Sequence, residues 1–184
     1  MAALARNPRR GRIVLALFVG GLVFGLLQLP ALGTMSDRGV GIIELELMRT
    51  SAKAAQYHHQ LGAEGRDAAR TSLLLDYPYL IFYGLFFATA CVVVADRGAE
   101  RGMRRLARLG IVLAFGALIG AFCDAVENAA LLHVLAGYTD QPWPGIAFAS
   151  AVVKFALTIA AALFAVVGYL LTRSRTAPTR PARP

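Results

Sequence analysis

Apolar residues gather in four runs along the chain, and polar segments separate these runs. Each run has at least the roughly 20 residues that a helix needs to cross about 30 Å of hydrocarbon. Because backbone groups in lipid must be paired within the chain, the runs predict four transmembrane helices. Their approximate bounds are 13–32, 73–95, 109–135 and 146–171. We therefore expect an all-α fold, a four-transmembrane-helix bundle that forms a single membrane domain over residues 1–172.

The first run has a second interpretation as a signal peptide. Arginines precede it, and Ala31 and Gly33 form a small-x-small pair. However, its apolar stretch is longer than the about 7–15 residues of a typical signal-peptide core. An uncleaved first helix is therefore the preferred interpretation, and three further runs follow in either case.

The long segment between the first two runs, residues 34–72, is too apolar for a simple linker. Polar residues recur in its first half every three to four positions, which indicates a polar stripe along a helix. This stripe contains Glu46, Arg49, Lys53, Gln56 and Gln60. Such an external amphipathic helix fits a position on the outer membrane surface or as a cap over the bundle. Gly62 would end it, and Pro78 would kink the next helix near the membrane surface.

Glu44 lies on the helix face away from that stripe. Its carboxylate is expected either to point into the mouth of the bundle or to reach water past its neighbours. His58 and His59 follow about 14 residues later, which is about 21 Å along a straight helix. They share no small site with Glu44 unless the helix breaks, so we interpret them as a solvent-facing pair.

Composition and charge narrow the class of protein. With 57% hydrophobic and 16% charged residues, the chain differs from soluble globular domains, disordered tails and disulfide scaffolds. The net charge of +8 first suggests a nucleic-acid partner, but the placement of the charges argues against one. Of the 19 Lys and Arg residues, four precede the first run, five lie between the second and third, and four follow the last. The positive-inside rule then makes both termini cytoplasmic, in a multi-pass protein of the cell membrane.

Three smaller features add to this picture. The tail 173–184 is rich in Pro and Arg, so we expect it to be disordered, basic and cytoplasmic. Cys91 and Cys123 lie inside apolar runs and form no C-x-x-C pair, which indicates neither a redox motif nor a zinc site. Glycines spaced four apart at 21–25 and 116–120 favour close helix packing within the bundle, with homo-oligomerisation as the alternative.

Four ionisable residues lie inside the apolar runs, namely Asp76, Asp124, Glu127 and Lys154. A charge near the bilayer centre costs several kcal/mol, so such residues normally face the protein interior and pair. Counting inward from the external end of each run places all four in the outer half of the membrane. They are the strongest functional signal in the sequence.

Helix periodicity groups these charges with other polar side chains on one face of the third run and one face of the second. We infer a polar pocket that opens to the external side. Its expected members are Glu44, Asp76, Tyr79, Tyr83, Asp124, Glu127, Asn128 and Lys154. Asp124 or Glu127 would pair with Lys154, and the other members would supply further hydrogen bonds.

Three carboxylates facing one ammonium leave an excess of negative charge. At least one carboxylate is then expected to bind a proton near neutral pH, because burial and like charge disfavour its ionised form. A proton-transfer group needs this condition, and a purely structural network would share it. No metal site is predicted, since there is no Glu-x-x-His pair and the chain has 3 histidines. No cofactor is indicated.

At these residues the chain resembles a family of small bacterial four-span integral membrane proteins. The shared motifs are Leu-Asp-Tyr-Pro at 75–78, Asp-Ala-Val-Glu-Asn at 124–128 and Val-Lys-Phe at 153–155, with a Glu-Leu stretch at 44–47. The resemblance covers most of residues 10–172. That family has no assigned activity, so the resemblance implies that the ionisable residues form one unit and implies no chemistry.

The preferred functional hypothesis is that the outer-half pocket binds a small amphipathic or lipid-like ligand, with membrane lipids as its surroundings. If the ligand reacts, Glu127 or Asp76 is the candidate acid or base, and whether the protein is an enzyme stays open. A structural or assembly protein, whose buried charges fix helix packing, is the first alternative. A small proton-coupled transporter subunit is the second, although the internal repeats common in transporters are missing.

Overall fold

The computed structural model describes residues 9–173, and over this range the chain forms four long helices and one short one. In chain order these are α2 (Arg9–Asp37), α3 (Ile42–Glu46), α4 (Ser51–Glu100), α5 (Arg104–Leu135) and α6 (Trp143–Arg173). The four long helices are each long and apolar enough to cross a membrane. The chain is therefore an all-α, multi-pass membrane bundle, as the four apolar runs predict. The tail beyond Arg173 lies outside the described residues.

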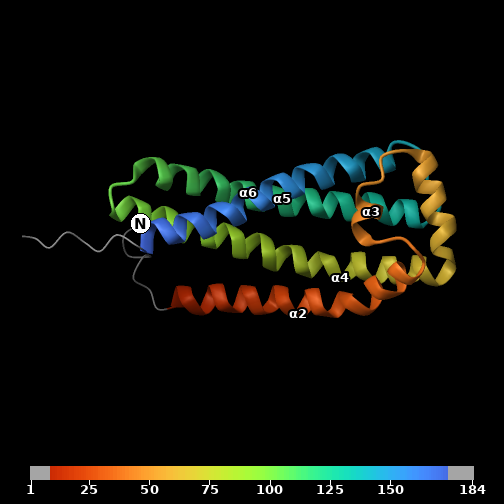
Figure 1. Cartoon of the computed structure of the whole chain (residues 1–184), viewed down its shortest axis with the longest axis horizontal. Helices are drawn as coiled ribbons and strands as arrows, with labels where there is room; N and C mark the ends of the chain where they lie inside the picture. Colours follow the sequence, from red (N-terminus) through yellow and green to blue (C-terminus); the bar gives the residue numbers. More distant parts are fainter. Residues whose placement is uncertain (1–8, 174–184) are drawn as a thin grey trace, which may run out of the picture.

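The long helices run side by side with alternating direction (Figure 1). The first residues of α2, the last residues of α6 and the turn between α4 and α5 lie at one end, which we call the terminal end. α3 and the turn between α5 and α6 lie at the other, which we call the α3 end. Each long helix extends past its apolar run at one or both ends, because polar flanking residues continue the helical hydrogen bonds.

The helix α4 begins as a short arm across the α3 end and then turns into the bundle (Figure 1). The turn is at Gly62, whose φ of 63° and ψ of −171° are the only non-helical values inside α4. Glycine adopts a positive φ without the steric cost of a Cβ, so this residue ends the arm as predicted. At Pro78 the backbone keeps helical φ and ψ, and the kink expected there stays a prediction. Membrane helices tolerate proline where neighbouring groups satisfy the freed backbone carbonyl.

The single amphipathic helix expected between the first two spans is divided in two. α3 ends at Glu46, and residues 47–50 separate it from α4. Thr50 caps the new helix, because its Oγ1 accepts a hydrogen bond from Lys53 N at 3.3 Å. Leu45 in α3 and Met48 within the break are both buried. The break lets α4 start in a new direction, as the arm across the α3 end (Figure 1).

Two apolar cores lie at different depths in the bundle. The core near the α3 end takes buried side chains from all five helices, and most of them are large: Met35, Val40, Leu45, Met48, Leu61, Leu73, Leu131, Val134 and Leu135. The core nearer the terminal end joins α4, α5 and α6 mainly through small side chains: Ala88, Cys91, Val94, Ala114, Ala117, Ala161 and Phe164. Along each of these three helices, the polar side chains described below lie between the two cores.

The helix α2 is the least embedded of the long helices. It packs against α4 and touches α3, and within the described residues its backbone makes no contact with α5 or α6, since no Cα atoms of these helices lie within 8 Å of its own. A Cβ added at Gly25 would lie 3.6 Å from the Tyr79 ring of α4, and one added at Gly120 of α5 would lie 3.2 Å from Thr158 of α6. The glycine spacings therefore serve packing within one chain, and homo-oligomerisation stays a prediction.

Candidate functional site

The Lys154 ammonium lies at the centre of a group of buried charges, which we call the ion cluster. Its Nζ is 2.9 Å from Asp124 Oδ1, 2.8 Å from Glu127 Oε2 and 3.3 Å from Glu46 Oε1. The Lys154 side chain is 8% exposed, and those of Asp124 and Glu127 are 4% and 0% exposed. One side chain of α6 thus joins α3 and α5. The two pairings predicted as alternatives, with Asp124 and with Glu127, are both present.

Hydrogen bonds extend the ion cluster to α4. The Tyr83 hydroxyl donates to Asp124 Oδ2 at 2.7 Å, so Asp124 has Tyr83 on one oxygen and Lys154 on the other. One turn further along α5, Asn128 Nδ2 donates to Asp76 Oδ2 at 2.7 Å. The Tyr79 ring lies against the Tyr83 ring, with their centroids 5.3 Å apart. Apart from Glu44, the structure brings every predicted member of the pocket to this one place.

Glu46, and not Glu44, reaches the ion cluster from α3. Glu44 is exposed, and its carboxylate accepts a hydrogen bond from the Gly41 backbone N–H at the start of α3. The expectation that Glu44 faces the mouth of the bundle is therefore corrected. A continuous amphipathic helix would have put Glu46 in the polar stripe, whereas the break after α3 turns it inward. Burial raises the pKa of the Glu46 carboxyl, and the nearby Lys154 ammonium opposes this effect.

A cavity of about 370 Å³ lies beside the ion cluster. Polar side chains from all five helices line it, namely Gln28, Glu46, Asp76, Tyr79, Tyr83, Asp124, Lys154 and Thr158. Glu127 is not among the lining residues and is fully buried. Of the two candidate acid–base residues, Asp76 therefore borders the cavity, whereas Glu127 does not.

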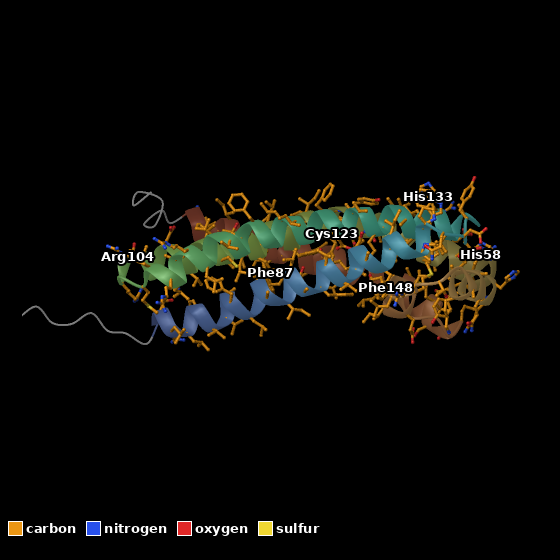
Figure 2. All side chains as sticks on the ribbon, turned by 90° about the horizontal axis from the view of Figure 1, so that it is seen from above. His58, Phe87, Arg104, Cys123, His133 and Phe148 are labelled. Atoms are coloured by element: carbon orange, nitrogen blue, oxygen red, sulfur yellow. The ribbon has the colours of Figure 1, made fainter. Side chains whose placement is uncertain are left out.

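Two largely apolar hollows continue from this cavity toward the terminal end. One of about 350 Å³ lies between α2 and α4, and one of about 710 Å³ is lined by α2, α4 and α6. Phe87 borders the cavity and both hollows, and Figure 2 shows it between Arg104 at the terminal end and His58 at the α3 end. We call the two hollows together the lateral groove. Since α2 does not contact α6 in the described residues, no helix–helix contact closes the groove on that side.

The histidines lie away from the cavity. The rings of His58 and His59 are 6.1 Å apart on the arm of α4, and His133 stacks on Trp143 with centroids 4.0 Å apart. Figure 2 shows His58 and His133 at the α3 end. Over residues 9–173, no group of three or more His, Cys, Asp and Glu side chains is arranged to hold a metal ion.

Two cavity-lining residues besides Glu46 were missed in the sequence. Gln28 is 8% exposed, and its Oε1 accepts a hydrogen bond from Ser72 Oγ at 3.1 Å. It is the one strongly polar residue in the first apolar run, which is a signal that could have found it. Thr158 Oγ1 is buried and has no hydrogen-bond partner within the described residues. Threonine is ordinary in apolar helices, so nothing in the sequence points to this position.

Comparison with family models, with curated proteins and with solved structures finds no match to this chain. Its function is therefore argued from the geometry of the cavity, the ion cluster and the lateral groove.

Proposed function

We propose that this protein binds a small lipid-like amphiphile, with the polar head in the cavity and the apolar chain in the lateral groove. The observation that carries the proposal is the junction at Phe87, where a cavity lined by charged and hydroxyl groups meets an apolar groove. Ligand sites are typically concave and mostly apolar, with a few converging polar groups that fix orientation. A molecule with one polar and one apolar end matches both parts.

We place the site in the outer leaflet of the cell membrane, with both termini in the cytoplasm. The support is the charge at the terminal end, where the last turn of α4, the connecting turn and the first turns of α5 carry Arg97, Arg101, Arg104, Arg105 and Arg108. The positive-inside rule favours this end as the cytoplasmic one. The ligand head would then lie near the external surface, under α3. Binding is the function proposed, and Asp76 is the cavity-lining carboxylate that an acid–base step would use.

The test is the lipid that copurifies with the protein, identified by native mass spectrometry after mild detergent extraction. Gly25 borders both the cavity and the lateral groove, so Gly25→Phe fills the site, whereas Gly33 of the same helix has open space around it. We expect a copurified amphiphile in the unmodified protein and in Gly33→Phe, and its loss in Gly25→Phe. Equal retention by both variants would show that the lipid binds elsewhere.

A second candidate function is a structural one, in which the ion cluster only holds the helices together. The observation that favours it is the position of Lys154 between carboxylates of α3 and α5. Replacing a buried ion pair by apolar side chains is often neutral, whereas removing one partner is destabilising. If this candidate is right, replacing Lys154, Asp124 and Glu127 together by leucine, with Glu46→Gln, recovers the thermal stability lost in Lys154→Leu alone, because no buried charge is then left unpaired. If this multiple variant is as unstable as Lys154→Leu, the ion cluster has no such independent role.

A further inference from the structure

Among the carboxylates that line the cavity, Asp76 is the one that has no basic side chain of the described residues as its ion-pair partner. Lys154 is within 3.3 Å of Glu46, Asp124 and Glu127, and no ion pair of Asp76 is found in the described part of the chain. Its hydrogen bonds come from neutral side-chain amides, those of Asn128 and Gln28. Asp76 is only partly buried and faces the cavity. A cation brought by a ligand would find an uncompensated carboxylate there.

The surroundings of the cavity carry more negative than positive groups. Four carboxylates lie at or behind its wall, and Lys154 is the one basic side chain among its lining residues. Buried like charges are unfavourable until a proton or a cation compensates them. A site with this charge balance concentrates cations and disfavours anions. The electrostatics therefore favour a positively charged ligand head over a carboxylate or phosphate.

Two tyrosine rings lie on the same helix face as the Asp76 carboxylate, which has no ion-pair partner within residues 9–173. Tyr79 and Tyr83 follow Asp76 by three and seven residues on α4, which places all three side chains along one helix face. The Tyr83 hydroxyl is already bonded to Asp124, so the ring is the part of Tyr83 that remains for a ligand. Aromatic faces attract ammonium groups, and a carboxylate next to two aromatic rings is a typical ammonium site. Thr158 Oγ1, without a partner in the described residues, adds a hydrogen-bond acceptor in the same cavity.

The lateral groove defines the other end of the ligand. Its apolar part on α4 begins at Tyr79 and Tyr83 and continues past Phe87 to Val93 and Val94, and Asp96, Arg97 and Glu100 line its far end. From Tyr83 to Val94 the helix rises about 16 Å, at 1.5 Å per residue. This is close to the about 15 Å of hydrocarbon in one leaflet. A single extended acyl or alkyl chain therefore fits the groove while its head lies at Asp76.

We propose that the cavity selects a single-chain amphiphile with an ammonium head, in which Asp76 is the counter-ion and Tyr79 and Tyr83 contact the cation. The chain of this ligand lies in the lateral groove along α4. This inference rests on the proposed function, since it names the ligand class of the same site. It differs from that function in requiring a positive charge on the head.

The experiment uses the full chain in phosphatidylcholine nanodiscs and a hexadecylamine that carries a diazirine in its alkyl chain. Unlabelled hexadecylamine, hexadecanol and hexadecanoate compete with this photoprobe at equal concentration in the membrane. At about pH 8 the amine is protonated and the acid ionised, so the three competitors differ in head charge. We expect labelling of peptides from residues 86–97, and competition by the amine at least about tenfold stronger than by the alcohol or the acid.

Variants locate the charge that is recognised. Asp76→Asn removes the counter-ion and should weaken competition by hexadecylamine by about tenfold or more, with little change for hexadecanol. Asp67→Asn is the matched control, because Asp67 is exposed on the same helix and lies outside the cavity. If Asp76→Asn does not fold, the comparison of the three heads in the unmodified protein decides the question.

The outcomes separate this inference from the proposed function. Equal competition by all three heads would overturn the ammonium inference and leave binding of an amphiphile intact. Stronger competition by the acid would also overturn it, and would identify Lys154 as the group that recognises the head. If no competitor reduces labelling, the groove has no specific amphiphile site, and the proposed function fails together with the inference.

Discussion

The two ends of the bundle are held together by different kinds of contact. Near the terminal end, α4, α5 and α6 approach closely through Gly84, Gly110 and Gly168, and small side chains fill the core. Toward the α3 end, large apolar side chains and a network of charges join the same helices. In lipid there is little hydrophobic force between helices, so close packing serves the first region. The second region carries buried polar groups, which need partners within the protein.

This difference determines where the polar binding groups lie. Packing of small residues leaves little room between α4, α5 and α6, and no cavity-lining charge lies in that region. The ion cluster holds its helices through long side chains, and a cavity of about 370 Å³ remains beside them. Charges that stabilise the fold at this end are therefore the same groups that a ligand meets. Three substitutions and one pH dependence test this comparison, in order of decreasing effect.

Lys154→Met should be the most destabilising change. It leaves Asp124 and Glu127 buried without their cation, and removing one partner of a buried pair typically costs about 3–5 kcal/mol. Thermal unfolding in detergent, followed by circular dichroism, measures the effect. Lys53→Met is the control, because Lys53 is exposed on the arm of α4. Similar melting temperatures for both variants would mean that the ion cluster contributes no more than a surface charge.

Gly110→Ala should be the most damaging small change in the terminal half. A Cβ at this position would lie 2.8 Å from Ala95 Cβ, 2.9 Å from the Cys91 carbonyl oxygen and 3.0 Å from the Phe164 ring. Backbone cannot easily move aside, so we expect a loss of about 1–3 kcal/mol in the free energy of unfolding. Gly116→Ala meets only Leu157 at 3.5 Å and should be tolerated. Equal tolerance at both glycines would contradict the close packing of this half.

Tyr83→Phe removes one hydrogen bond and keeps the ring. Hydrogen bonds between membrane helices contribute about 0.6 kcal/mol on average, with a maximum of about 1.7 kcal/mol. The bond to the Asp124 carboxylate should lie near the upper value, because Asp124 is almost fully buried. Reversible unfolding in mixed micelles measures the difference from the unmodified protein. The matched change Tyr79→Phe, at the neighbouring ring, should have a smaller effect.

The smallest effect is a pH dependence at α3. The pKa of Glu46 is raised above its ordinary 4.5 in the folded protein, so folding favours its protonated form. Its contribution is complete below about pH 4.5 and is lost as the pH rises through the raised pKa. Hydrogen exchange of residues 42–46 should therefore become faster, beyond the intrinsic effect of pH, across this window. Glu46→Gln should remove the extra dependence, and Glu44→Gln should retain it.

Sequence periodicity was sufficient for the architecture and for most of the cavity. The lengths of the apolar runs specify four spans, and the spacing from Asp124 to Asn128 places three polar groups on one helix face. Lys154 then has few possible partners inside an apolar bundle. These inferences depend only on local helix geometry and on the cost of unpaired charge in lipid. The four spans are confirmed, and the polar side chains of the long, regular helices lie together as this geometry predicts.

The segment between α2 and α4 shows why the break after α3 and the role of Glu46 could not be predicted from the sequence. Glu44 and Glu46 are two residues apart, and either can face inward, depending on where the helix breaks. At this break Leu45 and Met48 pack into a core with side chains of distant helices, such as Leu131. Local periodicity contains no information about those partners. The cavity and the lateral groove likewise depend on the absence of contact between α2 and α6, which is a property of packing alone.

The isolation of α2 has a consequence for how the protein is made. Of the described helices α2 leaves the ribosome first, and its only extensive partner among them is α4, so α2 has no such partner in the bilayer until α4 is synthesised. During that interval Gln28 has no Ser72 to bond with. Stable insertion therefore depends on the strongly apolar residues around this glutamine. Biogenesis is ordered in time, because the partner of α2 is synthesised before α5 and α6, which complete the core with α4.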